Sequence, residues 1–376
     1  MWPLFDRYLP GFESCVRDGN ASAIMCSYNA VRERLRCAGT LHWPRSYPRC
    51  TCVPQENGVP SCANKMLMTH LARDTWGFQG YITSDCGAVS AVINDHHYTS
   101  TSDQTCAATL QAGMDIDCGS YLQDNLQAAL AAKAVSMDDV DTALTNQFSV
   151  QFRLGMFDPA SVQPYSKLGA ADVNTKAHQQ LALSAAQQGI VLMKNAGGHL
   201  PLDASTTKSV AVIGPNGNAT TTMQGNYYGQ APYLISPLMG VQSYTTASYT
   251  QGCTIAANDT SGFAAAIAAA EAADQVIMVM GLDQTQEREG HDRVILSFPG
   301  VQLQLIEKVA AAAKSPITVV LMCGGPVDVS ALVSNPKVGA MLWVGYPGQS
   351  GGQAMADVIF GTVNPGTWSL PFLDRL

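Results

Sequence analysis

The sequence lacks a run of apolar residues long enough to cross a bilayer. Its first residues contain neither the basic start nor the apolar stretch of a secretory signal peptide. It is also poor in charge, since Asp, Glu, Lys and Arg make up 13 % of the residues and leave a net charge of -8. Nucleic acid, which needs a basic stripe, and membranes are therefore not expected as partners. A neutral, polyhydroxylated substrate suits this charge balance, although solubility alone would explain it.

The chain is rich in residues that build cores and disulfides. Its 376 residues are 47 % hydrophobic, which excludes a mainly disordered chain and predicts two or more domains. It contains 11 cysteines and three glycosylation sequons, at Asn20, Asn218 and Asn258. Together these features favour an oxidising, secretory origin. The connectivity of the cysteines cannot be read from their spacing.

Hydrophobic patterning divides the chain into two α/β regions joined by a polar stretch. In the first region we expect strands at 22–27 and 80–83, and helices at 103–113, 123–134 and 138–154. In the second region we expect helices at 176–186, 263–273, 301–313 and 351–359, and strands at 210–213, 276–280, 317–322 and 338–343. Short β-branched runs between helices predict a mostly parallel sheet covered on both faces.

Asp85 directly follows a predicted buried strand, in the segment GYITSDCGAV at 80–89. An ionisable residue at a strand end, followed by small residues, lies where α/β folds place their active sites. The alternative is that Asp85 only caps the next helix, which Asp does well. From this segment alone the cap interpretation is favoured.

A second chemically dense segment is GLDQTQEREGHDR at 281–293, which follows the predicted strand at 276–280. It concentrates charge inside an otherwise apolar region. The alternative is an ordinary solvated loop with Glu–Arg pairs that stabilise the fold little.

The segment at 80–89 resembles the nucleophile motif of family 3 glycoside hydrolases, in the form found in fungal β-xylosidases. Further segments in the family's order resemble its other motifs: MCSYN at 25–29, NGVPSCAN at 57–64, AGMDIDCG at 112–119, QGIVLMKN at 188–195, VIGP at 212–215, GLD at 281–283 and GYPGQ at 345–349. The resemblance implies a (β/α)8 barrel followed by an α/β sandwich. It also implies the removal of β-linked sugars from chain ends with net retention.

Retention requires two carboxyl groups roughly 5 Å apart across the anomeric carbon. The resemblance assigns the nucleophile to Asp85. It assigns the general acid/base to Glu287, three residues before Gly290, with Glu289 as the second candidate. One group must be ionised to attack, and the other must carry a proton for the leaving group.

Two further residues are candidate substrate contacts. Tyr28 resembles the tyrosine that approaches the nucleophile in relatives, with a core tyrosine as the alternative. Cys86 stands where many family β-glucosidases carry Trp, and a cysteine there is typical of the β-xylosidase branch, where it shapes a pocket for a pentose. The alternative for Cys86 is a small buried thiol without a role.

By resemblance, residues 1–160 are the C-terminal part of the barrel domain, 161–175 are a linker and 176–376 are the sandwich domain. Relatives carry most of the barrel before the segment at 25–29 and a fibronectin-like domain after the sandwich, so we expect truncation at both ends and a lost leader peptide. Residues 32–56 interrupt the family pattern and are interpreted as an insertion or a retained intron, with a surface loop as the alternative. Without this segment Cys26 and Cys62 would lie close together.

No cofactor or metal is expected. Cys50-X-Cys52 lacks the spacing of a zinc site, and the adjacent His96 and His97 do not face one ligand. The expected function is an extracellular, retaining exo-hydrolase that releases D-xylose from xylo-oligosaccharides, with β-glucosidase or α-arabinofuranosidase specificity as alternatives. Another alternative is a catalytically inactive fragment or a carbohydrate-binding remnant, because part of a barrel leaves an open sheet edge.

Overall fold

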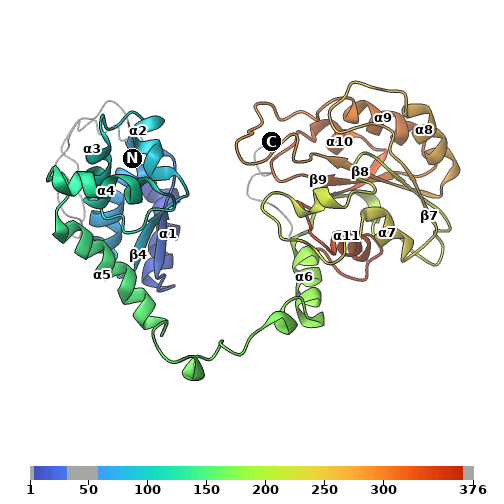
Figure 1. Cartoon of the computed structure of the whole chain (residues 1–376). Coiled ribbons are helices and arrows are strands. Elements are labelled where there is room, and N and C mark those ends of the chain that lie inside the picture. Colours follow the sequence, from blue (N-terminus) through green and yellow to red (C-terminus); the bar gives the residue numbers. More distant parts are fainter. Residues whose placement is uncertain (1–3, 32–57, 367–376) are drawn as a thin grey trace. The chain divides into compact units, whose positions relative to one another are not determined.

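The computed structural model describes residues 4–31 and 58–366. The chain divides into two compact units, Met1–Lys167 and Leu168–Leu376, each of which is described by itself (Figure 1). The division falls inside the segment 161–175 that the sequence marks as a linker. The segment 32–56, interpreted from the sequence as an insertion or retained intron, lies outside the described residues.

The first unit contains a short parallel sheet. Strands β1 (Ala23–Cys26) and β4 (Tyr81–Ser84) pair in parallel, with Cys26 opposite Ser84. Ile116 adds a parallel bridge to Thr83, so three chain segments run side by side. Both predicted strands are confirmed. A small antiparallel pair, β2 (Ala30–Val31) with β3 (Val59–Pro60), lies apart from this sheet.

Helices surround the sheet of the first unit (Figure 1). They are α1 (Leu9–Arg17), the π-helix η3 (Met66–Thr75), α2 (Ala88–Asn94), α3 (Ser102–Leu110), α4 (Tyr121–Ala131) and α5 (Met137–Arg153). The three helices predicted in this unit, now α3 to α5, are confirmed. Helix α5 starts with a capping box, in which Ser136 and Asp139 bond each other's backbone N–H. Ile82, Val89 and Met114 are fully buried in the core.

The second unit is built on a six-stranded sheet in the order β5-β10-β9-β8-β6-β7. The strands are β5 (Val191–Asn195), β6 (Val210–Ile213), β7 (Ala247–Thr250), β8 (Gln275–Gly281), β9 (Ile317–Met322) and β10 (Val338–Trp343). All neighbours pair in parallel except β5 with β10. The predicted, mostly parallel sheet is confirmed, and the α/β fold class with it.

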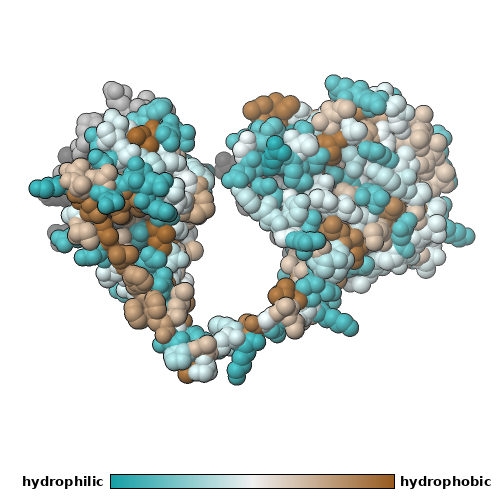
Figure 2. Space-filling model, viewed as in Figure 1, coloured by the Kyte–Doolittle hydropathy of each residue, from teal (hydrophilic) through white to brown (hydrophobic). Residues whose placement is uncertain are grey.

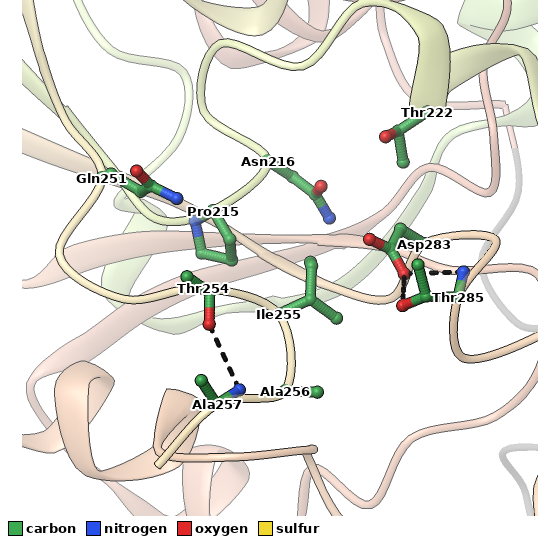
Figure 3. A pocket seen from close by; sticks show the side chains of 10 residues that line it. All are labelled: Pro215, Asn216, Thr222, Gln251, Thr254, Ile255, Ala256, Ala257, Asp283 and Thr285. Carbon is green, nitrogen blue, oxygen red and sulfur yellow. Dashed lines mark hydrogen bonds between the residues drawn. The ribbon is translucent and has the colours of Figure 1, made fainter. Parts of the chain in front are cut away.

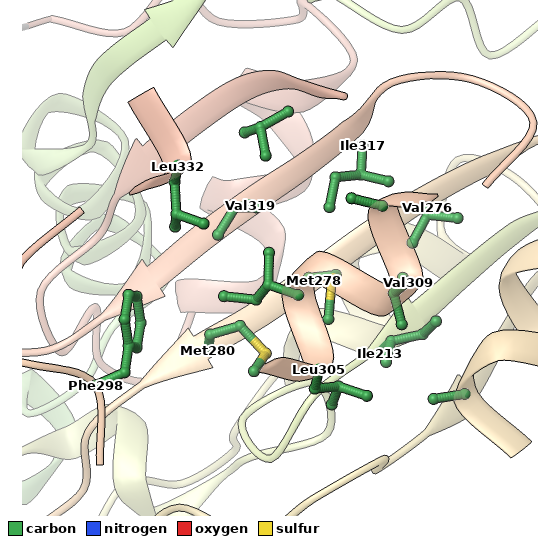
Figure 4. Close-up of a cluster of buried hydrophobic side chains, with 14 of the residues drawn as sticks. Ile213, Val276, Met278, Met280, Phe298, Leu305, Val309, Ile317, Val319 and Leu332 are labelled. Carbon is green, nitrogen blue, oxygen red and sulfur yellow. The ribbon is translucent and has the colours of Figure 1, made fainter. Parts of the chain in front are cut away.

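Helices cover both faces of this sheet, as predicted. Along β6, Ala211 and Ile213 point into the core beneath α8 (Phe263–Ala272) and α9 (Gln302–Ala312), shown in Figure 4. Val210 and Val212 point into the opposite core, beneath α7 (Pro237–Gln242) and α11 (Gly351–Ile359). Helices α6 (Lys176–Gly189) and α10 (Ser330–Ser334) complete the unit. Each fully buried aliphatic side chain stabilises the fold by about 1.5–3 kcal/mol.

Apolar side chains also reach the surface along α5 of the first unit (Figure 2). Leu144 and Phe148 are 42 % and 41 % exposed on this helix, and Phe152 is 67 % exposed. Among the helices of residues 4–31 and 58–366, none combines the length and apolarity needed to span a bilayer.

Candidate active site

Asp85 is held at the carboxyl end of β4. Its N–H donates to the Cys26 carbonyl at 2.8 Å, which extends the parallel ladder by one step. One carboxylate oxygen accepts the Cys86 N–H at 2.7 Å. The cap interpretation is wrong, because the residue at the N-cap of α2 is Gly87, in a left-handed conformation with φ 85°. The half-exposed Asp85 carboxylate is therefore accessible at a rigid strand end.

Beside this strand, at Ile82, lies an ion pair with a buried carboxylate that sequence reasoning missed. The side chain of Asp115 is 2 % exposed and accepts bonds from Arg73 at 2.6 Å, the Ile82 N–H at 2.6 Å and Asn146 at 2.8 Å. Burial raises the pKa of the Asp115 carboxyl, and these bonds oppose the rise. The only signal in the sequence was that Asp115 belongs to the motif at 112–119. The pair ties η3, β4 and α5 together at Ile82, in the strand that ends at Asp85.

A disulfide joins Cys86 to Cys118 and fixes the turn that follows Asp85. The Cys118 N–H donates to Ser84 Oγ at 2.9 Å, and the Gly87 N–H donates to the Cys118 carbonyl at 2.7 Å. Cys86 is exposed, so its interpretation as a small buried thiol is wrong. A second disulfide joins Cys26 to Cys62, so the two residues lie together in the chain that contains residues 32–56, and not only without that segment as expected.

Tyr28 reaches the same turn. Its hydroxyl donates to the Cys86 carbonyl at 2.5 Å, one residue beyond Asp85. His96 Nε2 lies 2.5 Å from the Tyr28 carbonyl. Because Tyr28 is 43 % exposed, the core interpretation is wrong. Its contact with a substrate stays a prediction.

Glu287 occupies a cradle of hydrogen-bond donors in the second unit. One carboxylate oxygen accepts the Gly324 N–H at 2.6 Å and the Tyr346 hydroxyl at 2.6 Å, and the other accepts the Gly325 N–H at 2.8 Å. These groups follow β8, β9 and β10, so the carboxyl ends of three parallel strands meet at one carboxylate. The alternative of a solvated loop with Glu–Arg pairs is wrong for Glu287, which is bound by amides and a phenol.

The surroundings of Glu287 respond to its charge. Burial and the bond to Glu287 raise the pKa of the Tyr346 phenol far above its usual range, so that Tyr346 remains a donor. Burial and the same charge raise the pKa of the Cys323 thiol to about 12, which leaves it unreactive. A Cβ on residue 325 would lie 2.8 Å from the carboxylate, so any side chain there would displace Glu287 from its position.

Glu289, the second candidate, is exposed, and no hydrogen bond or ion pair of its side chain occurs among residues 4–31 and 58–366. The structure therefore positions Glu287 and leaves Glu289 loose. Asp85 belongs to the first unit and Glu287 to the second. Both catalytic assignments stay predictions.

The remaining candidates lie on the surface. Asn20, Asn218 and Asn258 are all exposed, and Asn218 accepts a bond from Ser236 at 2.7 Å. The described ranges contain no group of three His, Cys, Asp or Glu side chains able to hold a metal ion. His97 is exposed and His96 half-exposed.

Comparison with known proteins covers both units. Residues 3–150 match the model of the glycosyl hydrolase family 3 N terminal domain, and residues 190–372 match the family's C-terminal domain. The probable beta-D-xylosidase 7 of Arabidopsis thaliana is 45 % identical over 366 residues, which is 96 % of this chain and 44 % of that protein. The beta-xylosidase/alpha-L-arabinofuranosidase 1 of Medicago sativa subsp. varia is 43 % identical over 365 residues, with 96 % and 44 % covered.

A solved structure has the same fold. It is a GH3 exo-beta-xylosidase (XlnD) in complex with a xylobiose aziridine activity based probe. It superposes with a TM-score of 0.85 at 41 % identity, covering 96 % of this chain and 43 % of that one. The chain thus spans less than half the length of these relatives.

Proposed function

Because the chain belongs to glycosyl hydrolase family 3, we propose that it carries the catalytic carboxylates of a retaining exo-β-xylosidase. The proposed reaction releases β-linked D-xylose from the non-reducing ends of xylo-oligosaccharides during xylan degradation. The observation that carries the proposal is the Glu287 cradle, which holds one carboxylate at the junction of three strand ends. The names of the relatives support the substrate class.

Asp85 would attack the anomeric carbon and form a glycosyl-enzyme ester. The strand end keeps its carboxylate in a fixed direction, which favours in-line attack. Glu287 would protonate the glycosidic oxygen in this step and remove a proton from water in the next. The cradle fixes the position of this carboxyl group.

The preference for a pentose rests on the turn after Asp85. Cys86 is bonded to Cys118, so a disulfide occupies the position where many family β-glucosidases have a Trp side chain. An α-L-arabinofuranosidase activity is the second candidate, since the Medicago relative carries both names.

The test compares aryl β-xyloside, β-glucoside and α-L-arabinofuranoside as substrates of the folded chain. We expect the β-xyloside to be cleaved fastest, with the β-anomer of xylose as the first product seen by NMR. A folded chain that cleaves none of the three would favour the inactive or carbohydrate-binding alternative.

We also propose that the protein is secreted and glycosylated. Two disulfides and three exposed sequons support this assignment. Expression in a secreting eukaryotic host should give a chain whose mass falls on treatment with an N-glycan hydrolase. An unchanged mass would contradict glycosylation.

A further inference from the structure

The order of connections in the second unit reverses at β6. This strand lies between β7 and β8. The chain leaves β6 through α7 on one face of the sheet and leaves β8 through α9 on the other face. Open α/β sheets bind ligands outside the carboxyl ends of two such neighbouring strands.

A cavity of about 430 Å³ lies at this point (Figure 3). Asn216 lines it from the loop after β6, Gln251 and Thr254 from the loop after β7, and Asp283 and Thr285 from the loop after β8. Its volume falls in the range of small-molecule sites, ~300–1,000 Å³. The topology and the cavity therefore indicate the same place independently.

The lining has the chemistry of a neutral sugar site. Amide and hydroxyl groups alternate with the apolar surfaces of Pro215, Ile255 and Ala256, and the cavity lining includes no Lys or Arg. Sugars present hydroxyls and C–H faces that match such a mixture. The Asp283 carboxylate opposes phosphates and other anions.

Several lining groups are already fixed by the fold. Asn216 is 2 % exposed and donates to the Leu282 carbonyl at 3.1 Å. Asp283 accepts the Thr285 N–H at 2.9 Å and hydroxyl at 2.5 Å, while its own carbonyl accepts the Glu287 N–H at 3.1 Å. Gln251 is exposed, and its side chain makes no hydrogen bond with another described residue. Asn216 and Asp283 are thus held in place, whereas the Gln251 side chain is free to adjust to a ligand.

We propose that this cavity binds a neutral oligosaccharide through groups of the second unit alone. The ligand is a chain of two or three sugars held by Gln251, Thr254 and Asp283. That these sugars are xylose rests on the proposed function. Through Asp283, an occupied cavity also steadies the loop that carries Glu287.

The test is an NMR titration of the chain with xylotriose, using isoleucine labelled with ¹³C in its δ-methyl group. Asp85→Ala is present throughout so that the probe is not consumed. Ile255 reports on the cavity, and Ile82, in the strand that ends before Asp85, reports on the first unit. We expect a saturable shift of the Ile255 methyl.

Two variants locate the site. Ala256 is exposed at the cavity, so Ala256→Trp should fill the space and weaken binding at least about tenfold, whereas Ala265→Trp, at an exposed position of α8, should leave it unchanged. Gln251→Ala should weaken binding about three- to tenfold by removing one hydrogen-bonding group.

Three results would overturn the proposal. They are the absence of an Ile255 shift, an affinity that neither Ala256→Trp nor Gln251→Ala lowers, and competition by inorganic phosphate. The experiment distinguishes a failure of this inference from a failure of the proposed function. Binding at Ile255 with no hydrolysis by the chain with Asp85 intact would sink the hydrolase proposal alone. Hydrolysis without an Ile255 shift would sink only this inference.

Discussion

The two units hold their candidate catalytic carboxylates in different ways. The Asp85 carboxylate accepts a bond from the next residue, Cys86, although its backbone N–H donates to Cys26 in β1. Glu287 is fixed by residues 37, 38 and 59 positions away in the chain. The side-chain bond of Asp85 is therefore local, whereas the side-chain bonds of Glu287 form only when the whole sheet has assembled. Substitutions far away in the chain should therefore disturb the side chain of Glu287 more than that of Asp85.

The largest effect is expected at the local site. Asp85→Ala should lower aryl β-xyloside hydrolysis by about 10⁴-fold, because no other group can form the ester. Azide should restore part of the rate by taking the place of the carboxylate. Asp95→Ala removes a carboxylate from the exposed end of α2 and should leave the rate unchanged. Equal rates in Asp85→Ala and the unmodified chain would refute the nucleophile assignment.

The matched test in the second unit compares Glu287→Gln with Glu289→Gln. Loss of the general acid should slow hydrolysis by about 10²–10⁴-fold. The loss should shrink for a dinitrophenyl leaving group, which departs without a proton. Glu289→Gln should change the rate little, since its side chain is exposed and loose. The reverse pattern would move the assignment to Glu289.

Arg73→Leu tests the ion pair between Arg73 and Asp115, which holds β4 at Ile82. It leaves the Asp115 carboxylate buried without its cation and should destabilise the first unit by about 3 kcal/mol at pH 7. Burial raises the pKa of Asp115, so the folded chain binds a proton at this carboxyl more readily than the unfolded chain does. The destabilisation should therefore grow as pH rises through the folded-state pKa and shrink as pH falls below it.

Hydrogen exchange of the Ile82 amide, which donates to Asp115, measures this effect directly. Protection should fall in Arg73→Leu at pH 7 and recover towards the unmodified level in acid. The same loss at every pH would show that the charge of Asp115 has no part in it.

The smallest expected effect tests whether the hydrogen bonds from Gly324 and Gly325 position Glu287. In Gly325→Ala the new methyl group meets the Glu287 carboxylate at 2.8 Å and must displace it. We expect about a 10- to 100-fold loss of rate from the disturbed charged hydrogen bonds. The control is Gly229→Ala, since nothing lies within 4 Å of a Cβ at that position. A rate loss shared by both variants would argue against the cradle.

The burial of each strand explains which strands could be predicted from the sequence. β6, β8, β9 and β10 were predicted because they are continuous buried runs. The sheet-edge strands β5 and β7 were missed, because both are partly exposed and carry polar residues.

For the site, the motif at 80–89 contained most of the surroundings of Asp85. It did not contain the Cys118 partner of Cys86, because cysteine spacing leaves the connectivity open. Tyr346 stood in a motif noted only for its resemblance, and nothing local links it to Glu287. Such contacts exist only once the strand ends have been brought together.

The most direct measurement treats the folded chain with a xylobiose aziridine probe and maps the labelled peptide by mass spectrometry. The account predicts one probe per chain, bonded to Asp85 and absent in Asp85→Ala. Label on another carboxylate, or a folded chain that takes up no label, would contradict it.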